Sequence, residues 1–188
     1  MSSTIKIVGF SGVVREESYN KAALRVAQDV TPRDAELDIV ALDELPAYDA
    51  QMATDEPASV RAFKAQLRAA DAVLIATPEY KGMLPHSLQK ALSWIAHSDE
   101  STLVAGKPIA VMGVGRQLDS ERQHSILRQF LIHHGARVVG APEVYVAAGW
   151  EKVDDEGNVA DEATRQQIRA LMASLVAQAR EQDTVLID

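Results

Sequence analysis

The loop at residues 10–20, FSGVVREESYN, contains residue types suited to binding a phosphate. Gly12 permits a tight turn, and Arg15 carries a fixed charge with paired donors that match a phosphate. Ser18 stands at the expected start of a helix, whose first amides lack acceptors within the helix and favour an anion. These features predict a phosphate-binding loop. The alternative is that Ser18 only caps the helix and that Arg15 is a solvated surface charge.

A second candidate segment is residues 77–95, TPEYKGMLPHSLQKALSWI. Pro78 restricts the backbone, Gly82 opens it, and Tyr80 supplies a flat aromatic surface. This combination is suited to holding a planar ligand against backbone amides. The alternative is an ordinary loop, in which Tyr80 packs into the fold and Trp94 belongs to the core.

A third candidate loop, GVGR at residues 113–116, follows an apolar run, whereas several common anion and nucleophile motifs are absent. The chain has no G-x-x-x-x-G-K-[ST] sequence. Its only G-x-G, from Gly113 to Gly115, lacks the third glycine of a dinucleotide-binding fingerprint. Val13 stands where the nucleophile elbow of a serine hydrolase needs its second glycine. Nucleotide hydrolysis by a P-loop and serine hydrolase chemistry are therefore disfavoured.

The composition disfavours several other classes of protein. Nineteen Lys and Arg against 27 Asp and Glu give a net charge of −8, which repels nucleic acid and anionic membranes. The chain has no cysteine, which excludes disulfides and thiol nucleophiles. Its five histidines, His124 among them, lack metal-ligand spacing and are expected to be structural or surface residues. No stretch approaches the roughly eighteen apolar residues of a membrane span, and no export signal is recognisable. A cytoplasmic protein without a metal site is expected.

The elements that must position these loops alternate between strand and helix. Short apolar runs at 5–10, 72–76 and 108–112 predict central parallel strands, an alternating segment at 36–42 predicts a strand nearer an edge, and a further strand is expected within 137–146. Helical patterns occupy 18–30, 57–70, 121–134 and 161–181, and another begins at Pro85. One face of 121–134 is expected to carry Ile126, Leu127, Phe130 and Leu131, and an apolar stripe of 161–181 is expected at Ile168, Leu171, Met172, Leu175 and Val176. Five such alternations predict a doubly wound α/β sheet, with ligands beyond the carboxyl ends of its strands. One domain, residues 1–188, is expected.

Three segments together resemble the motifs of a known family. GVVREESYN at 12–20 resembles the phosphate loop G-S-L-R-x-x-S-x-N, and LPAYD at 45–49 resembles the segment L-P-x-Y-[DN]. Residues 77–95 resemble T-P-E-Y-N-x-x-x-P-x-x-L-K-N-A-[IL]-D-W. In this order, the three motifs are similar to those of the NAD(P)H-dependent FMN reductases, which include soluble quinone, chromate and azo-dye reductases.

The resemblance implies a flavodoxin-like sheet of five parallel strands in the order 2-1-3-4-5, with FMN at the carboxyl end. It implies that the first loop holds the phosphate, through Gly12, Val13, Arg15, Ser18 and Asn20. The second loop would border the isoalloxazine ring, largely through main-chain groups, at Pro78, Glu79, Tyr80, Lys81 and Gly82. The third loop would flank the other side of the flavin, at Gly113, Val114 and Gly115.

The resemblance also implies an activity. A nicotinamide, NADPH or NADH, would give a hydride to the flavin and leave, and a small acceptor such as a quinone would then take the electrons. The flavin would carry this chemistry, so no catalytic side chain is assigned. A homodimer or homotetramer is implied. Two alternatives are a non-enzymatic FMN electron carrier and a flavin-free regulatory domain, the latter because Val13 and Lys81 depart from the family motifs.

Overall fold

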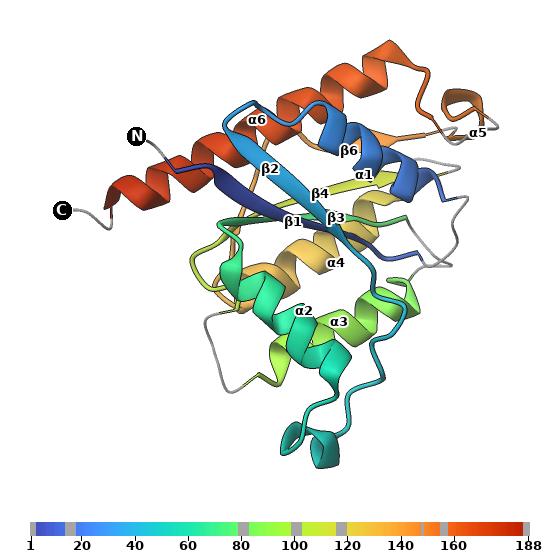
Figure 1. The fold of residues 1–188 in the computed structure, drawn as a ribbon. Helices are drawn as coiled ribbons and strands as arrows, with labels where there is room; N and C mark the ends of the chain where they lie inside the picture. The colour runs from blue at the N-terminus through green and yellow to red at the C-terminus, as the bar shows by residue number, and fades with distance from the viewer. Residues whose placement is uncertain are drawn as a thin grey trace.

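The central element of the fold is a parallel sheet (Figure 1). The computed structural model describes residues 3–13, 18–78, 83–98, 103–115, 120–147, 149–154 and 158–185. Within these ranges the strands are β1 (Ile5–Ser11), β2 (Ala35–Val40), β3 (Ala72–Ala76), β4 (Pro108–Val114), β5 (Arg137–Val138) and β6 (Val144–Val146). The spatial order is β2-β1-β3-β4-β5, with β6 also paired to β4, and every pairing is parallel. The strand order that the family resemblance implied is therefore confirmed, and β6 is an additional strand.

Helices cover both faces of the sheet. They are α1 (Tyr19–Asp29), α2 (Ala58–Ala69), α3 (His86–Ala96), α4 (Ser120–His133), α5 (Gly149–Lys152) and α6 (Glu162–Val185), with a short 3-10 turn at Ala50–Ala53. Figure 1 shows α1 and α6 on one face and α2, α3 and α4 on the other. Among the described residues, no helix combines the length and the apolar character that a membrane crossing requires.

The fifth position of the sheet differs from the prediction, because two short strands share it. β5 pairs with the first half of β4, where Pro108 faces Arg137. β6 pairs with the last half of β4, where Met112 faces Val144. Pro142 lies between them and has no N–H to donate to a sheet ladder, which accounts for an interrupted strand. The single strand expected within 137–146 is thus divided.

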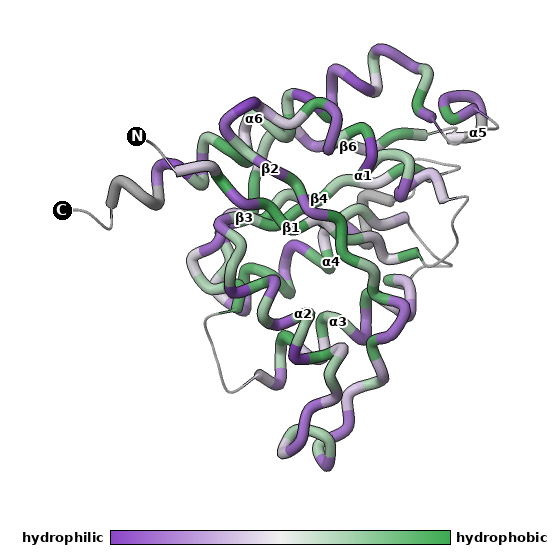
Figure 2. Tube along the Cα trace, viewed as in Figure 1, coloured by the Kyte–Doolittle hydropathy of each residue, from purple (hydrophilic) through white to green (hydrophobic). Residues whose placement is uncertain are grey.

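Burial follows the apolar pattern of the sequence. Every residue of β3 and β4 is buried, whereas Leu37 is the only buried residue of β2, as expected nearer an edge. Figure 2 shows hydrophobic residues concentrated along the central strands between the helix layers. The predicted apolar stripe of the last helix is also buried, at Ile168, Leu171, Met172, Leu175 and Val176.

Helix α4 presents a different face from the one that its apolar residues predicted. Ile126 and Phe130 were expected on the buried face with Leu127 and Leu131, but Ile126 is 45% exposed. Leu127 and Leu131 are fully buried, and so is His124, one turn before Leu127. The face that packs against the sheet therefore includes a histidine in place of an isoleucine.

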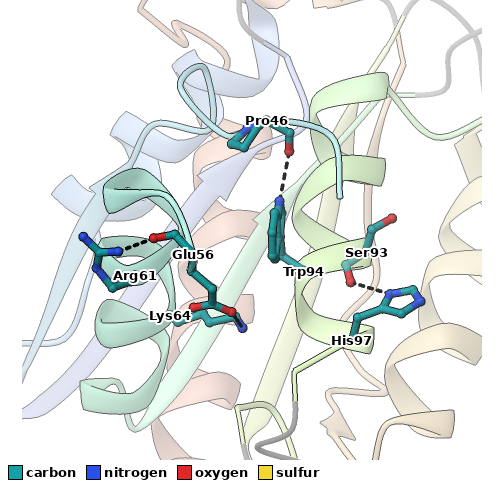
Figure 3. Close-up of polar contacts among 7 residues, drawn as sticks. All are labelled: Pro46, Glu56, Arg61, Lys64, Ser93, Trp94 and His97. Atoms are coloured by element: carbon teal, nitrogen blue, oxygen red, sulfur yellow. Dashed lines mark hydrogen bonds and ion pairs between the residues drawn. The ribbon is translucent and has the colours of Figure 1, made fainter. Parts of the chain in front are cut away.

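The segment 45–49 is fixed over α3 by the fully buried Trp94 (Figure 3). The indole Nε1–H donates to the main-chain carbonyl of Pro46 at 2.9 Å. Tyr48 packs edge-on against the indole, with ring centroids 5.0 Å apart. The ammonium of Lys64 lies 5.7 Å from the indole centroid and is paired with the carboxylate of Glu56. Trp94 therefore belongs to the core, as one reading of the sequence expected.

At the amino edge of the sheet, Lys107 connects β4 to the end of α2. Its ammonium donates to the carbonyl oxygens of Leu67 at 2.8 Å and Arg68 at 3.1 Å, and also to that of Ala70. The last carbonyls of a helix lack partners within the helix, so a cation at this place satisfies them. Burial lowers the pKa of Lys107, and the nearby Asp71 carboxylate opposes that effect.

We expect Lys107→Met to lower the free energy of unfolding by about 1.5–3 kcal/mol, because several charge-assisted hydrogen bonds are lost while the aliphatic stem is kept. Urea unfolding followed by circular dichroism measures this change. Lys6→Met at an exposed position of β1 is the matched control and should change stability by less than about 0.5 kcal/mol. Equal effects of the two substitutions would contradict this role of Lys107.

Candidate functional site

Three of the candidate loops leave the sheet at one edge. β1, β3 and β4 are neighbours, and the register places Ser11 beside Ala76 and Ala76 beside Met112. The pairing continues past the strands: the N–H of Gly12 donates to the carbonyl of Ala76, and that of Thr77 donates to the carbonyl of Met112, both at 3.0 Å. The three predicted loops therefore begin side by side at one edge of the sheet, with Thr77 between the other two.

Gly12 has no room for a side chain. A Cβ at this position would lie 2.9 Å from the hydroxyl of Thr77 and 3.2 Å from side-chain atoms of Pro85 and Leu88. The hydroxyl of Ser87, in the first turn of α3, donates to the carbonyl of Gly12 at 2.7 Å. The start of the first loop is therefore held against the start of α3.

The predicted N-cap is present at the start of α1. The hydroxyl of Ser18 accepts a hydrogen bond from the N–H of Asn20 at 3.2 Å. The N–H of Val13 donates to the hydroxyl of Ser11 at 3.1 Å. An eleven-residue helix such as α1 presents further first-turn amides and a partial positive charge at this end. This arrangement fits a phosphate group.

The side chain of Asn20 joins α1 to the end of β4. It is almost fully buried; its Nδ2 donates to the carbonyl of Val114 at 2.8 Å, and its Oδ1 accepts from the N–H of Val114 at 3.0 Å. The resemblance to known reductases had implied that Asn20 holds the phosphate. In the structure its amide instead pairs with both main-chain groups of Val114 and links the first loop to the third.

The third loop packs tightly against its neighbours. A Cβ on Gly113 would lie 2.6 Å from the carbonyl oxygen of Thr77 and 2.6 Å from Nε2 of His124. The N–H of Gly115 donates to the carbonyl of Val146 at 2.9 Å, and the carbonyl of Gly115 accepts from Gly149 at 3.0 Å. The loop is therefore anchored to β6 and α5 as well as to β3.

The second loop is described at Thr77 and Pro78 and again from Met83. The carbonyl of Pro78 accepts a 3.2 Å hydrogen bond from the hydroxyl of Thr77. The remaining predicted site residues lie outside the described residues: Arg15, Glu79, Tyr80, Lys81 and Gly82. Val13 lines a hollow of about 220 Å³ on the β2 side of the first loop. The hollow is lined by Ser11, Val13, Lys21, Leu24, Arg25, Ile39, Val40, Ala41, Leu42 and Asp43.

Two side chains that hold this edge together were not predicted from the sequence. Ser87 had been included only as part of a helix, and His124 had been treated as a structural or surface histidine. A signal for His124 was present, because it lies three residues before Leu127 and seven before Leu131, both of which are buried. Nothing in the sequence indicated that Ser87 would bond to Gly12, 75 residues earlier.

The described part of the site is built to bind rather than to react. Its polar groups are mainly main-chain amides and carbonyls, and its glycines allow close packing of the three loops. Such a site can hold a phosphorylated, planar cofactor by its main chain, and FMN combines a phosphate with a planar ring. His124 is a titratable side chain near this edge, but it is fully buried under Thr77.

Comparisons with known proteins agree with this geometry. A family model described as NADPH-dependent FMN reductase matches residues 5–151. An NAD(P)H-dependent FMN reductase from Pseudomonas aeruginosa is 32% identical over 177 residues, which cover 93% of this chain and 95% of that protein. A quinone reductase from Escherichia coli K12 is 33% identical over 172 residues, which cover 87% of this chain and 89% of that protein.

A solved structure also resembles this one. FerB, a flavoenzyme NAD(P)H:(acceptor) oxidoreductase from Paracoccus denitrificans, gives a TM-score of 0.84 at 26% identity. The similarity covers 94% of this chain and 98% of that chain. The likeness therefore extends over nearly the whole length of both proteins.

We expect Gly113→Ala to lower the free energy of unfolding by about 1–3 kcal/mol, because the added Cβ would overlap the main-chain oxygen of Thr77 and the ring of His124. Gly140→Ala is the matched control, since a Cβ there meets no atom within 4 Å. Urea unfolding of the two variants measures the difference. Equal stability of both variants would show that β4 and the Thr77 loop are not in close contact.

Proposed function

Since the chain belongs to the NADPH-dependent FMN reductase family, it is an oxidoreductase that uses FMN and a reduced nicotinamide, and we propose that FMN binds at the carboxyl edge of the sheet. The observation that carries this placement is the meeting of three glycine-containing loops at the ends of β1, β3 and β4, beside the capped start of α1. Edges of this kind, where neighbouring connections run to opposite faces of the sheet, are where doubly wound folds bind ligands.

The phosphate is assigned to the first loop. Arg15 supplies a charged partner, and the amides at the start of α1, capped by Ser18, supply main-chain donors. Gly12 and Val13 of the same loop would lie beside the phosphate. Asn20 is assigned an indirect role, because its bonds to Val114 keep the start of α1 beside the end of β4.

The isoalloxazine ring is assigned to the second and third loops. The second loop would border it through Pro78, Glu79, Tyr80, Lys81 and Gly82. The third loop would flank it through Gly113, Val114 and Gly115. Lys81 would place a cation near the ring, which favours negative charge on it and so raises its reduction potential.

When bound, FMN supplies the redox chemistry: it takes a hydride from the nicotinamide and passes two electrons to a second substrate. The chain contributes a fixed position for the ring and a closely packed floor formed by Gly12, Thr77 and Gly113. No side chain is assigned as acid, base or nucleophile. We infer ping-pong kinetics, in which the oxidised nicotinamide leaves before the acceptor binds.

The acceptor is proposed to be a small quinone. Support comes from the Escherichia coli relative, which is named a quinone reductase. A small acceptor can also take electrons from a flavin without a partner protein. We infer a cytoplasmic enzyme. A homodimer or homotetramer is also proposed, because Met83, which directly follows the proposed ring segment, is 59% exposed, and Ile132 on α4 is 60% exposed.

Two measurements on the purified chain test the proposed function. Titration followed by flavin fluorescence should show quenching at about one FMN per chain. Steady-state oxidation of NADPH or NADH with 1,4-benzoquinone should give parallel double-reciprocal lines. Bound FMN with negligible nicotinamide oxidation would favour an electron carrier instead. No FMN binding at micromolar protein would refute the proposal and favour a flavin-free domain.

We expect Arg15→Ala to weaken FMN binding about tenfold or more and to leave riboflavin binding unchanged. A hydrogen bond to a charged group contributes about 1.5–3 kcal/mol. Riboflavin has no phosphate, so it makes no such bond to Arg15 and loses nothing when Arg15 is replaced. Dissociation constants from fluorescence titration give the comparison. Arg33→Ala, at an exposed position before β2, is the control and should change neither constant. If Arg15→Ala weakens both ligands equally, Arg15 is not a phosphate partner.

A further inference from the structure

His124 is a polar side chain buried directly beneath the start of the second loop. Its exposed fraction is 0%, and its Nε2 lies 3.0 Å from the carbonyl oxygen of Thr77. A carbonyl can only accept a hydrogen bond, so Nε2 must carry the proton. The ring therefore donates from α4 to the last main-chain carbonyl before Pro78.

This hydrogen bond completes the fixation of Thr77. The N–H of Thr77 already donates to Met112 of β4 at 3.0 Å. The imidazole fills the space under Gly113, where a Cβ would come within 2.6 Å of Nε2. Both main-chain polar groups of Thr77 are thus bonded to neighbouring elements, which fixes Thr77 and the start of Pro78 beside Gly113.

The surroundings of His124 favour the neutral form of its ring. Nδ1 has no hydrogen-bond partner among the described residues. Burial lowers the pKa of His124 and the positive charge of Arg128 adds to this, while the Thr77 carbonyl and the Glu143 carboxylate act in the opposite direction. The remaining aromatic neighbour is Tyr145 of β6, whose ring centroid lies 4.7 Å away. A neutral ring with its proton on Nε2 donates to Thr77 and leaves Nδ1 unprotonated.

An apolar side chain would fill the same space without burying an unpaired Nδ1, which costs free energy. Unlike an apolar side chain, the imidazole donates a hydrogen bond from Nε2 to the carbonyl of Thr77. Leu127 and Leu131 lie on the same face of α4 and show that leucine packs well against this part of the sheet. What His124 adds beyond filling space is therefore a directional hydrogen bond to the main chain of Thr77.

We propose that His124 is a positioning residue for the flavin ring: by holding the Thr77 carbonyl and packing under Gly113, it fixes Pro78 and Gly113, two of the residues assigned to the ring. This inference rests on the proposed function. It assigns His124 to the ring half of the site, whereas Arg15 belongs to the phosphate half. Loss of the His124 bond should therefore weaken FMN and riboflavin by the same factor.

Two substitutions separate this role from simple filling of space. His124→Leu keeps much of the volume but has no donor, whereas His124→Gln has an amide N–H that can reach the Thr77 carbonyl. We expect His124→Leu to weaken FMN and riboflavin equally, by roughly three- to tenfold, and to shift the visible absorption of the bound flavin. His124→Gln should stay within about twofold of the unsubstituted chain for both ligands.

The outcomes distinguish this inference from the proposed function. Failure of the unsubstituted chain to bind FMN overturns the proposed function itself. Normal FMN binding by the unsubstituted chain, with identical losses in His124→Gln and His124→Leu, overturns only the positioning role. Weakening of FMN without weakening of riboflavin does the same, because it would move the effect to the phosphate.

A measurement on the unsubstituted chain keeps the inference testable if His124→Leu does not fold. Two-bond ¹H–¹⁵N spectra of the imidazole at pH 7 report which nitrogen carries the proton. We expect a neutral ring protonated at Nε2, with the same state in the chain loaded with FMN. A neutral ring protonated at Nδ1 alone could not donate from Nε2 to the Thr77 carbonyl and would overturn the proposal.

Discussion

The adjacency of β1, β3 and β4 in a parallel sheet is the constraint on which the site depends. Parallel strands end at the same edge, so the loops that follow these three strands must meet there. Hydrogen bonds continue the ladder beyond the strands, from Gly12 to Ala76 and from Thr77 to Met112. Long-range side-chain bonds then hold the loops in place, through Asn20 to Val114, Ser87 to Gly12, and His124 to Thr77.

The three side chains that make these bonds support the loops from within the fold. Asn20, Ser87 and His124 are buried and bond to main-chain groups of the loops, so their effect on a ligand is indirect. A site of this kind binds a cofactor that carries its own reactivity and leaves little chemistry to side chains. That fits an FMN-dependent oxidoreductase, in which the flavin rather than a side chain carries the redox chemistry.

Local patterns in the sequence predicted most of the fold. Continuous apolar runs identified β1, β3 and β4, and the i, i+3, i+4 stripe identified α6, because burial alone determines those patterns. The division of the fifth strand position depended on pairing with both halves of β4, which no local pattern reports. The contacts of Asn20, Ser87 and His124 join residues 94, 75 and 47 positions apart, so local spacing could not reveal them. The buried face predicted for α4 was wrong at one position, because Ile126 is exposed and His124 is buried.

Hydrogen–deuterium exchange of the chain with and without saturating FMN tests whether the flavin binds where the three loops meet. We expect FMN to slow exchange in peptides that cover residues 11–20, 77–84 and 113–116. We expect no change at the amino edge, in peptides around residues 67–71 and 104–108. Slowed exchange at the amino edge, or at only one of the three loops, would contradict a flavin site formed where β1, β3 and β4 end.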